Sequence, residues 1–301
     1  MRATIVPAER GAHPRPLRVL TSLPGRGRNT NPYLLQLIDG LAARPDVDVR
    51  YFSWRRALTG GYDVLHVHWP ERLLRGSTPA RALARRALVL LLLVRLRLTR
   101  IALVRTMHNL RSHEAGGPAE RALLAAFDRA TDLWIRLNPF TPLPPGAPAR
   151  TIVHGHYRNW FERSAPEPAV PGRLLFFGLL RPYKGVEELL DAFTAAPADA
   201  SLRLVGSAQD PTLKAAVEQA QQRDPRISSR IEYVPDAELA GEIEAAQVVV
   251  LPYRAVHNSG AALLALSLGR PVLMPRTDTT SWLQQEVGED WLLTYEPPLT
   301  A

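Results

Sequence analysis

The sequence predicts an α/β protein made of two domains, each with a doubly wound parallel sheet. Its 301 residues are enough for two cores of ordinary size. In both halves, short apolar runs alternate with segments of helical periodicity, which indicates right-handed βαβ units. A proline-rich stretch separates the two halves. We therefore predict a Rossmann-like domain over 1–161, a hinge over 162–172 and a second Rossmann-like domain over 173–301.

The elements of the first domain follow from apolar runs and helix-start signals. Pro32 suits the first turn of a helix, because its missing N–H would be unpaired there in any case. The expected strands are 17–22, 47–52, 64–68, 101–106, 133–137 and 150–153. The expected helices are 32–43, 79–97 and 118–129.

The second domain repeats the alternation. The expected strands are 173–178, 202–206, 230–234, 247–251 and 271–274. The expected helices are 185–195, 211–223, 236–245 and 259–268.

Composition excludes several classes of protein. The chain has no cysteine, so it has no disulfide and no cysteine-based metal site or nucleophile. Residues 1–7 are too short and polar to form a secretory signal. The long apolar run, 87–94, is far below the roughly 20 residues that a bilayer-spanning helix needs. We expect a cytoplasmic protein, for which peripheral binding to the inner face of the cell membrane is one of two open alternatives.

Charge is divided unevenly between the halves. Residues 1–160 hold 25 Lys and Arg against 10 Asp and Glu, whereas 161–301 hold 12 against 19. The basic half predicts contact with an anionic surface or acceptor. No aromatic residues are interleaved with these arginines as in a nucleic-acid-binding module, and the second half is acidic, so we expect no nucleic-acid partner.

The most informative segment is 176–188, which reads Phe-Phe-Gly-Leu-Leu-Arg-Pro-Tyr-Lys-Gly-Val-Glu-Glu. A buried strand runs into Gly178, presents Arg181 and Lys184, and opens a helix. Backbone N–H groups and the helix dipole favour anions at such a point. Two cations there suit a diphosphate better than a carboxylate.

This segment resembles the donor-binding signature of GT-B glycosyltransferases, in particular glycosyltransferase family 4. The resemblance covers essentially the whole chain in order. It implies the GT-B architecture, with two Rossmann-like domains facing a cleft. It also implies that the fold continues into C-terminal helices, so the sequence is expected to be truncated at Ala301.

A second segment, 249–272, is similar to the family block that joins a strand, a glycine-rich helix start and a Gly-x-Pro-Val step. The family's two glutamates would fall at Val256 and Leu264, so this chain lacks both. The helix start at 258–260 offers N–H groups to donor phosphates. The resemblance implies a set of donor-binding residues: Gly178, Gly206, Tyr253, Arg254, His257, Asn258, Ser259 and Gly260.

The first domain contributes three candidate pieces on the acceptor side. The loop at 23–33 precedes a helix and supplies Gly25, Gly27, Asn29 and Tyr33, although a plain mobile turn explains it nearly as well. His68 and Glu71 follow the third strand. With His66 they could suggest a metal, but no further ligand completes a zinc site, so we expect none.

The third piece is 106–114. His108 matches the position where related enzymes carry a histidine near the transferred sugar, and a histidine there can donate a hydrogen bond or act as a base. His113 and Glu114 are further candidates. A purely structural role as a cap or hydrogen-bonder is the alternative for the histidines.

The resemblance implies a glycosyltransferase that moves a sugar from a GDP- or UDP-linked donor to a hydroxyl of a glycan or polyprenyl-linked acceptor, in polysaccharide or glycolipid synthesis. Arg181 and Lys184 would stabilise the diphosphate leaving group, with no metal and no cofactor. The resemblance implies a retaining enzyme, which needs no protein nucleophile; with inversion, the alternative, His108 or Glu114 becomes the base. The rivals are a sugar epimerase, a nucleic-acid-binding protein and a non-catalytic partner of another transferase.

The helix at 79–97 allows two interpretations. Its arginines flank a Leu/Val run, so it could lie on an anionic bilayer. Alternatively its leucines face the sheet and its arginines are solvated.

Overall fold

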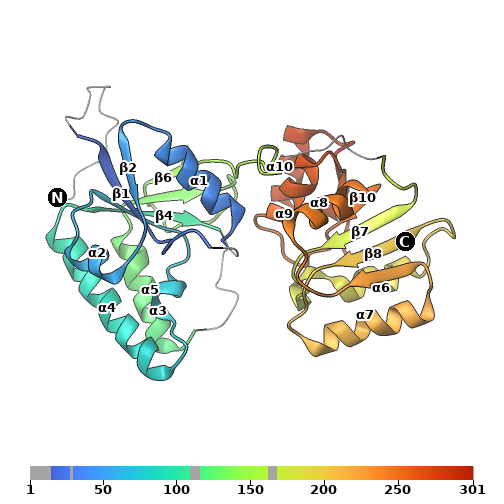
Figure 1. The fold of residues 1–301 in the computed structure, drawn as a ribbon, viewed down its shortest axis with the longest axis horizontal. Helices are drawn as coiled ribbons and strands as arrows, with labels where there is room; N and C mark the ends of the chain where they lie inside the picture. The colour runs from blue at the N-terminus through green and yellow to red at the C-terminus, as the bar shows by residue number, and fades with distance from the viewer. Residues whose placement is uncertain (1–14, 28–29, 109–115, 162–167, 301) are drawn as a thin grey trace. The chain divides into compact units, whose positions relative to one another are not determined.

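The computed structural model describes residues 15–27, 30–108, 116–161 and 168–300. Asn29, His113, Glu114 and the first part of the predicted hinge therefore lie outside the described residues. The chain divides into two compact units. The first comprises Met1–Leu137 and Thr141–Val153, and the second comprises Asn138–Phe140 and His154–Ala301 (Figure 1).

The first unit is a six-stranded parallel sheet with the strand order β2-β1-β3-β4-β5-β6. α1 covers one face, and α4 and α5 cover the other (Figure 1). Its strands are β1 (Leu17–Thr21), β2 (Val47–Arg50), β3 (Val64–Val67), β4 (Ala102–Met107), β5 (Leu133–Arg136) and β6 (Ala149–Thr151). Its helices are α1 (Pro32–Ala42), α2 (Trp54–Thr59), α3 (Glu71–Leu74), α4 (Pro79–Leu98) and α5 (Pro118–Ala130).

The second unit is also a six-stranded parallel sheet, with the order β12-β11-β10-β7-β8-β9. α6 and α7 cover one face, and α9 and α10 lie on the other (Figure 1). Its strands are β7 (Arg173–Phe177), β8 (Ser201–Val205), β9 (Ile227–Arg230), β10 (Val248–Val250), β11 (Val272–Pro275) and β12 (Leu292–Tyr295). Its helices are the 3₁₀ turn η1 (Pro182–Lys184), α6 (Val186–Phe193), α7 (Pro211–Arg223), α8 (Asp236–Glu244), α9 (Gly260–Ser267) and α10 (Asp278–Val287).

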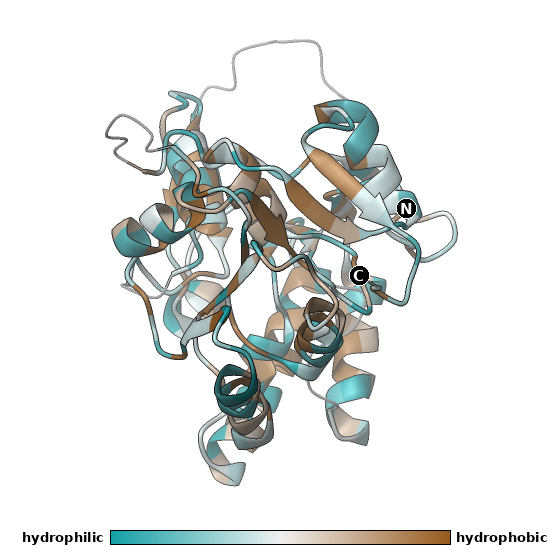
Figure 2. Ribbon diagram, turned by 90° about the vertical axis from the view of Figure 1, so that its right-hand side faces the viewer, coloured by the Kyte–Doolittle hydropathy of each residue, from teal (hydrophilic) through white to brown (hydrophobic). Residues whose placement is uncertain are grey.

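Both sheets are confirmed as the doubly wound, parallel type. Several strands are coloured as hydrophobic in Figure 2, as expected for strands in a sheet that is covered on both faces. β7, for example, ends in Leu175, Phe176 and Phe177, all buried.

One strand prediction was wrong. The sequence predicts a strand at 230–234, but β9 is Ile227–Arg230 and pairs with β8 from Leu202 to Val205. Ile227 supplies the buried anchor of this edge strand, whereas Tyr233 is 66% exposed. Only one residue of this edge strand is buried. The search for a longer apolar run therefore placed the strand at 230–234 instead of 227–230.

Candidate active site

The second sheet has a topological switch point between β7 and β10. Helices leave β7 toward one side of the sheet and β10 toward the other, which opens a crevice at the carboxyl ends of these strands, where open α/β sheets bind ligands. The segments after the two strands touch there: the Arg254 N–H donates to the Tyr183 carbonyl at 2.9 Å. A Cβ on Gly185 would collide with the carbonyl oxygen of Pro252.

Two glycines shape this edge. Gly178 follows β7 with φ +107°, and Gly206 follows β8 with φ +136°, a region that side chains rarely adopt. The Gly178 N–H donates to the Val205 carbonyl at 2.9 Å, and a Cβ on Gly206 would collide with the Gly178 carbonyl oxygen. The close passage of the two loops requires glycine at 206.

Lys184 is the central cation of this edge. It ends η1, and its Nζ lies 3.1 Å from the position of a Cβ built on Gly178 and 5.2 Å from the centroid of the Tyr253 ring. Burial, and then the charge of Arg181, lower the pKa of Lys184 to about 8. Within the described residues neither Arg181 nor Lys184 forms an ion pair. Two close, uncompensated cations favour an anionic ligand.

Arg254 differs from these two. Its Nε lies 2.7 Å from Oε1 of Glu188, and an Nη lies 3.8 Å from Glu187, both on the first turn of α6. Its charge is therefore compensated by two carboxylates. Arg254 orders the loop after β10 against α6.

The N-terminus of α9 is the other anion-favouring feature of this unit. Ser259 caps the helix, since its Oγ accepts from the Ala262 N–H at 3.1 Å. Asn138 Nδ2 donates to the His257 carbonyl and to Asn258 Oδ1, both at 2.9 Å. A Cβ on Gly260 would lie 3.3 Å from the Tyr157 hydroxyl.

Asn138 and Tyr157 were missed by sequence reasoning. The sequence signal for Asn138 was its position: it is a polar residue two positions after the end of the strand β5. Nothing in the sequence indicates that this residue would reach the loop at 257–258, 120 positions away.

The two positions where family 4 carries glutamates are apolar and packed. Val256 and Leu264 both contact the core of the second unit. Beside them His257 is half-buried, and burial lowers its pKa, so it is neutral at pH 7. Positions 256 and 264 therefore offer no carboxylate.

In the first unit, three histidines form one cluster at the carboxyl ends of β3 and β4. The rings of His66 and His68 are 4.4 Å apart between centroids, and His68 Nδ1 lies 3.0 Å from His108 Nε2. His66 Nε2 is hydrogen-bonded to Thr106 Oγ1 at 2.8 Å. Trp69 stacks on His108, with 4.3 Å between ring centroids.

Burial disfavours the charged forms of His66 and His68. It lowers the pKa of His66 to about 4, and it lowers the pKa of His68 well below its usual value, with His66 and His108 adding to the effect. His68 Nε2 is buried with no hydrogen-bond partner among the described residues. Tyr33 completes the cluster, with its ring 5.1 Å from that of His108.

An apolar pocket of about 450 Å³ lies beside the cluster, at the carboxyl ends of β1, β2 and β3. Three aromatic residues line it, Phe52, Trp54 and Trp69, and we call it the aromatic pocket. Arg72 lies 4.7 Å from the Trp69 ring centroid and adds a positive charge. The remaining lining residues are Ser22, Leu23, Pro24, Leu34, Ser53, Leu73 and Arg85.

The other acceptor-side candidates are less organised. The Gly27 N–H donates to Thr30 Oγ1 at 2.9 Å, and a Cβ on Gly25 would meet open space, so neither glycine is forced by packing. Glu71 begins α3 and is partly buried. Among the residues that the structure describes, no group of three His, Asp or Glu side chains could hold a metal ion.

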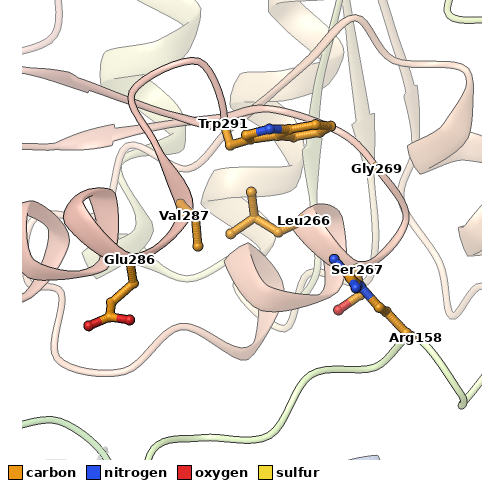
Figure 3. Close-up of a pocket in the computed structure, with 7 residues that line it drawn as sticks. All are labelled: Arg158, Leu266, Ser267, Gly269, Glu286, Val287 and Trp291. Carbon is orange, nitrogen blue, oxygen red and sulfur yellow. The ribbon is translucent and has the colours of Figure 1, made fainter.

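A second depression, of about 480 Å³, lies in the other unit (Figure 3). Arg158, Ser267, Glu286 and Trp291 line it, with Leu266, Gly269 and Val287. Residues 266–269 end α9 and Trp291 precedes β12, so this depression lies at the amino edge of the sheet. Lys184 lies at the opposite, carboxyl edge of the sheet. Open α/β sheets bind their ligands at that carboxyl edge and not at the amino edge.

Two doubly wound parallel sheets, with an anion-favouring switch point in the second, define the GT-B class of glycosyltransferase folds. Solved structures agree. Sucrose-phosphate synthase from Thermosynechococcus elongatus aligns with a TM-score of 0.67 at 18% identity, over 95% of this chain and 87% of that one. Anabaena HepE in complex with UDP aligns with a TM-score of 0.64 at 15% identity, over 94% and 86%.

The chain belongs to the group 1 glycosyl transferases, and it is a glycosyltransferase. The model of that family matches residues 171–297, which contain both donor-side segments. A GDP-mannose:glycolipid 4-beta-D-mannosyltransferase of Xanthomonas campestris pv. campestris is 48% identical over 293 residues, covering 97% of this chain and 83% of the relative. The predicted resemblance to family 4 is confirmed, as is the predicted transfer of sugar from a nucleotide-linked donor.

Proposed function

We propose that the protein transfers mannose from GDP-mannose to a hydroxyl of a glycolipid acceptor. The sequence left GDP and UDP open as donor nucleotides. Close similarity to a GDP-mannose-dependent enzyme along almost the whole chain supports GDP. The same relative's name supports a glycolipid acceptor.

The observation that carries the donor site is the pair of uncompensated cations at the switch point of the second sheet. Lys184 is fixed beside Gly178, whose missing side chain leaves the ammonium room to meet a ligand. As the glycosidic bond breaks, negative charge grows on the GDP leaving group. Lys184 and Arg181 stabilise that charge, and the N-terminus of α9 adds N–H donors.

We further propose that the transfer is independent of divalent metal. A metal would serve here to neutralise the diphosphate, and Lys184 with Arg181 already supplies two positive charges. Activity in the presence of a chelator, with Mg²⁺ and Mn²⁺ titrated back, tests this proposal. A strict requirement for added metal contradicts it.

We assign the acceptor to the aromatic pocket of the first unit. Flat aromatic walls suit the apolar faces of sugar rings, and Arg72 suits an anionic group on the carrier. The pocket adjoins Trp69, which stacks on His108. This contact supports His108 as the candidate base for the acceptor hydroxyl.

The stereochemical course that fits these assignments is inversion. Family 4 resemblance predicts retention, with inversion as the alternative that needs a base. GDP-mannose holds mannose in an α linkage, and the relative's name specifies a β-linked product. We therefore propose that His108 removes the proton of the acceptor hydroxyl, that its oxygen attacks C1 of mannose, and that GDP departs from the opposite face.

The decisive experiment measures transfer of labelled mannose from GDP-mannose to glycolipid, together with calorimetric binding of GDP, UDP and ADP. We expect GDP-selective binding that Lys184→Ala weakens about 10- to 100-fold, because a charge-assisted contact is lost. Lys214→Ala is the matched control, since Lys214 is exposed on α7 and forms an ion pair with Glu218 one turn along the same helix. Selective binding of UDP, or full activity of Lys184→Ala, contradicts the proposal.

The sequence also allowed a non-catalytic partner of another transferase, because both family glutamates are missing. GDP binding without turnover on any glycolipid acceptor would favour that alternative. Turnover by the purified chain alone would exclude it.

A further inference from the structure

α4 carries an apolar stripe on its outer surface. Five large apolar side chains of this helix are between 52% and 80% exposed: Leu83, Leu90, Leu91, Val94 and Leu98. With 3.6 residues per turn they share one face about 100° wide, and from Leu83 to Leu98 the stripe is about 22 Å long.

This stripe is not the face that builds the core. Val89, Leu92 and Leu96 lie on the opposite side of α4 and are buried in the first unit. That inner face packs against α2, α3 and α5 (Figure 1). α4 is thus apolar on two faces, and packing within the unit explains one of them.

The charged residues of α4 and of the segments that flank it in the sequence are all basic. Between Glu71 and Glu114 the chain has ten arginines and no Asp or Glu. On the helix, Arg86 and Arg97 flank the stripe on one side, and Arg100 follows its end. Arg95 instead anchors the helix, since its guanidinium donates to the carbonyls of Ala57 and Gly60.

We propose that the outer face of α4 docks the protein on an anionic lipid bilayer. The leucines insert among the acyl chains next to the headgroups, and the arginines meet lipid phosphates. No helix in the described part of the chain is long and apolar enough to cross a membrane. The contact is therefore interfacial, with α4 lying along the surface.

The charge pattern favours a bilayer over a second copy of the chain. An isologous contact through α4 would bring arginines against arginines, with no carboxylate on either helix to compensate them. An anionic bilayer offers an apolar interior to the leucines of the stripe and negatively charged headgroups to the flanking arginines. Binding to lipid is measured without substrate, so its result is independent of which sugar the protein transfers.

The test is co-sedimentation of the full chain with vesicles of phosphatidylcholine, with and without phosphatidylglycerol. We expect binding only to the anionic vesicles, weakened by salt. Leu90→Ser/Leu91→Ser should reduce it at least tenfold, and Arg97→Gln/Arg100→Gln on the order of 25-fold, since each arginine near an anionic surface contributes about fivefold. Tyr233→Ser is the matched control, an exposed apolar residue of the second unit.

Each variant is first shown to retain the wild-type melting temperature and affinity for GDP, so loss of folding or of the donor site is recognised separately. Equal binding to neutral and anionic vesicles, or binding that neither variant changes, overturns the proposal. It is also overturned if the chain binds no vesicles and instead forms a dimer that Leu90→Ser/Leu91→Ser dissociates.

Discussion

At the scale of single residues, Lys184 carries a positive charge at a buried position, next to a second positive charge. Burial and Arg181 lower its pKa to about 8, so its charged form is less stable in the fold than in water. Such a group gains most when a diphosphate arrives, because the ligand restores the interactions that burial removed. This is the physical reason for proposing Lys184 as the residue that stabilises the diphosphate.

Lys184 predicts how donor affinity depends on pH. Above about pH 8 the free protein loses the Lys184 proton, so affinity for GDP should fall about tenfold per pH unit. Calorimetry from pH 7 to 9.5 measures this. The control is Lys184→Arg, which stays charged over the whole range. Any pH dependence of its affinity comes from GDP or from other groups and is subtracted from the wild-type profile. Parallel pH profiles for the two proteins would contradict the prediction.

The buried histidines predict a loss of stability in acid. His66 has a pKa of about 4 in the fold and about 6.5 when unfolded, so between these values the unfolded chain binds more protons. The free energy of unfolding should then fall by ~3 kcal/mol as pH drops from 6.5 to 4. Urea denaturation at several pH values measures it.

The variant for that experiment is His66→Asn, which should flatten the pH dependence. His156→Asn is the control, because His156 is exposed. If both variants keep the wild-type slope, burial of His66 is not its source.

At the scale of elements, the turn between β7 and α6 depends on one glycine. Gly185 is left-handed, with φ +67°, and a Cβ there would collide with the Pro252 carbonyl oxygen. It is also the N-cap of α6 and the residue after Lys184. Its conformation therefore fixes both the helix start and the cation.

We expect Gly185→Ala to lower the free energy of unfolding by about 1–3 kcal/mol and to weaken GDP binding, because relieving the collision moves Lys184. Gly241→Ala is the matched control: Gly241 lies within α8, where a Cβ meets open space, and alanine should be neutral or stabilising by up to about 1 kcal/mol. Chemical denaturation and calorimetry report the two effects. If Gly185→Ala is destabilised but binds GDP as tightly as the wild type, the conformation of Gly185 does not fix the position of Lys184, and this part of the prediction is wrong.

Sequence patterns predicted most elements well, because parallel strands covered on both faces are apolar runs with clear ends. β7 and β10 are such strands. Elements whose stability comes from tertiary contacts were missed or displaced: α2, α3, α10 and β12 were not predicted, and β9 was shifted. Short helices and edge strands lack the periodicity on which the prediction depends.

The candidate site shows the same division. Gly178, Arg181, Lys184 and Ser259 follow strands in short, characteristic segments, so their neighbourhood could be anticipated. The aromatic pocket could not, because Phe52, Trp54 and Trp69 come together only when β1, β2 and β3 are laid side by side. The compensation of Arg254 by Glu188 likewise depends on a contact between residues 66 positions apart.

At the scale of the whole molecule, the two units carry different chemistry. The first holds a buried histidine cluster beside an apolar pocket, and the second holds the uncompensated cations. If the donor is bound by the second unit and the acceptor hydroxyl is deprotonated by the first, binding and catalysis should separate in variants. His108 is the residue that tests this separation.

We expect His108→Ala to lower kcat by about 10²- to 10⁴-fold, the usual contribution of a general base, while the Kd for GDP stays unchanged. The anomeric configuration of the product, determined by NMR, should be β with wild-type protein. A slow His108→Ala reaction that still gives the β product fits loss of a base in an inverting enzyme. An α-linked product would instead indicate retention and would contradict the proposal that His108 is the base of an inverting displacement, because the hydroxyl proton would then leave by another route.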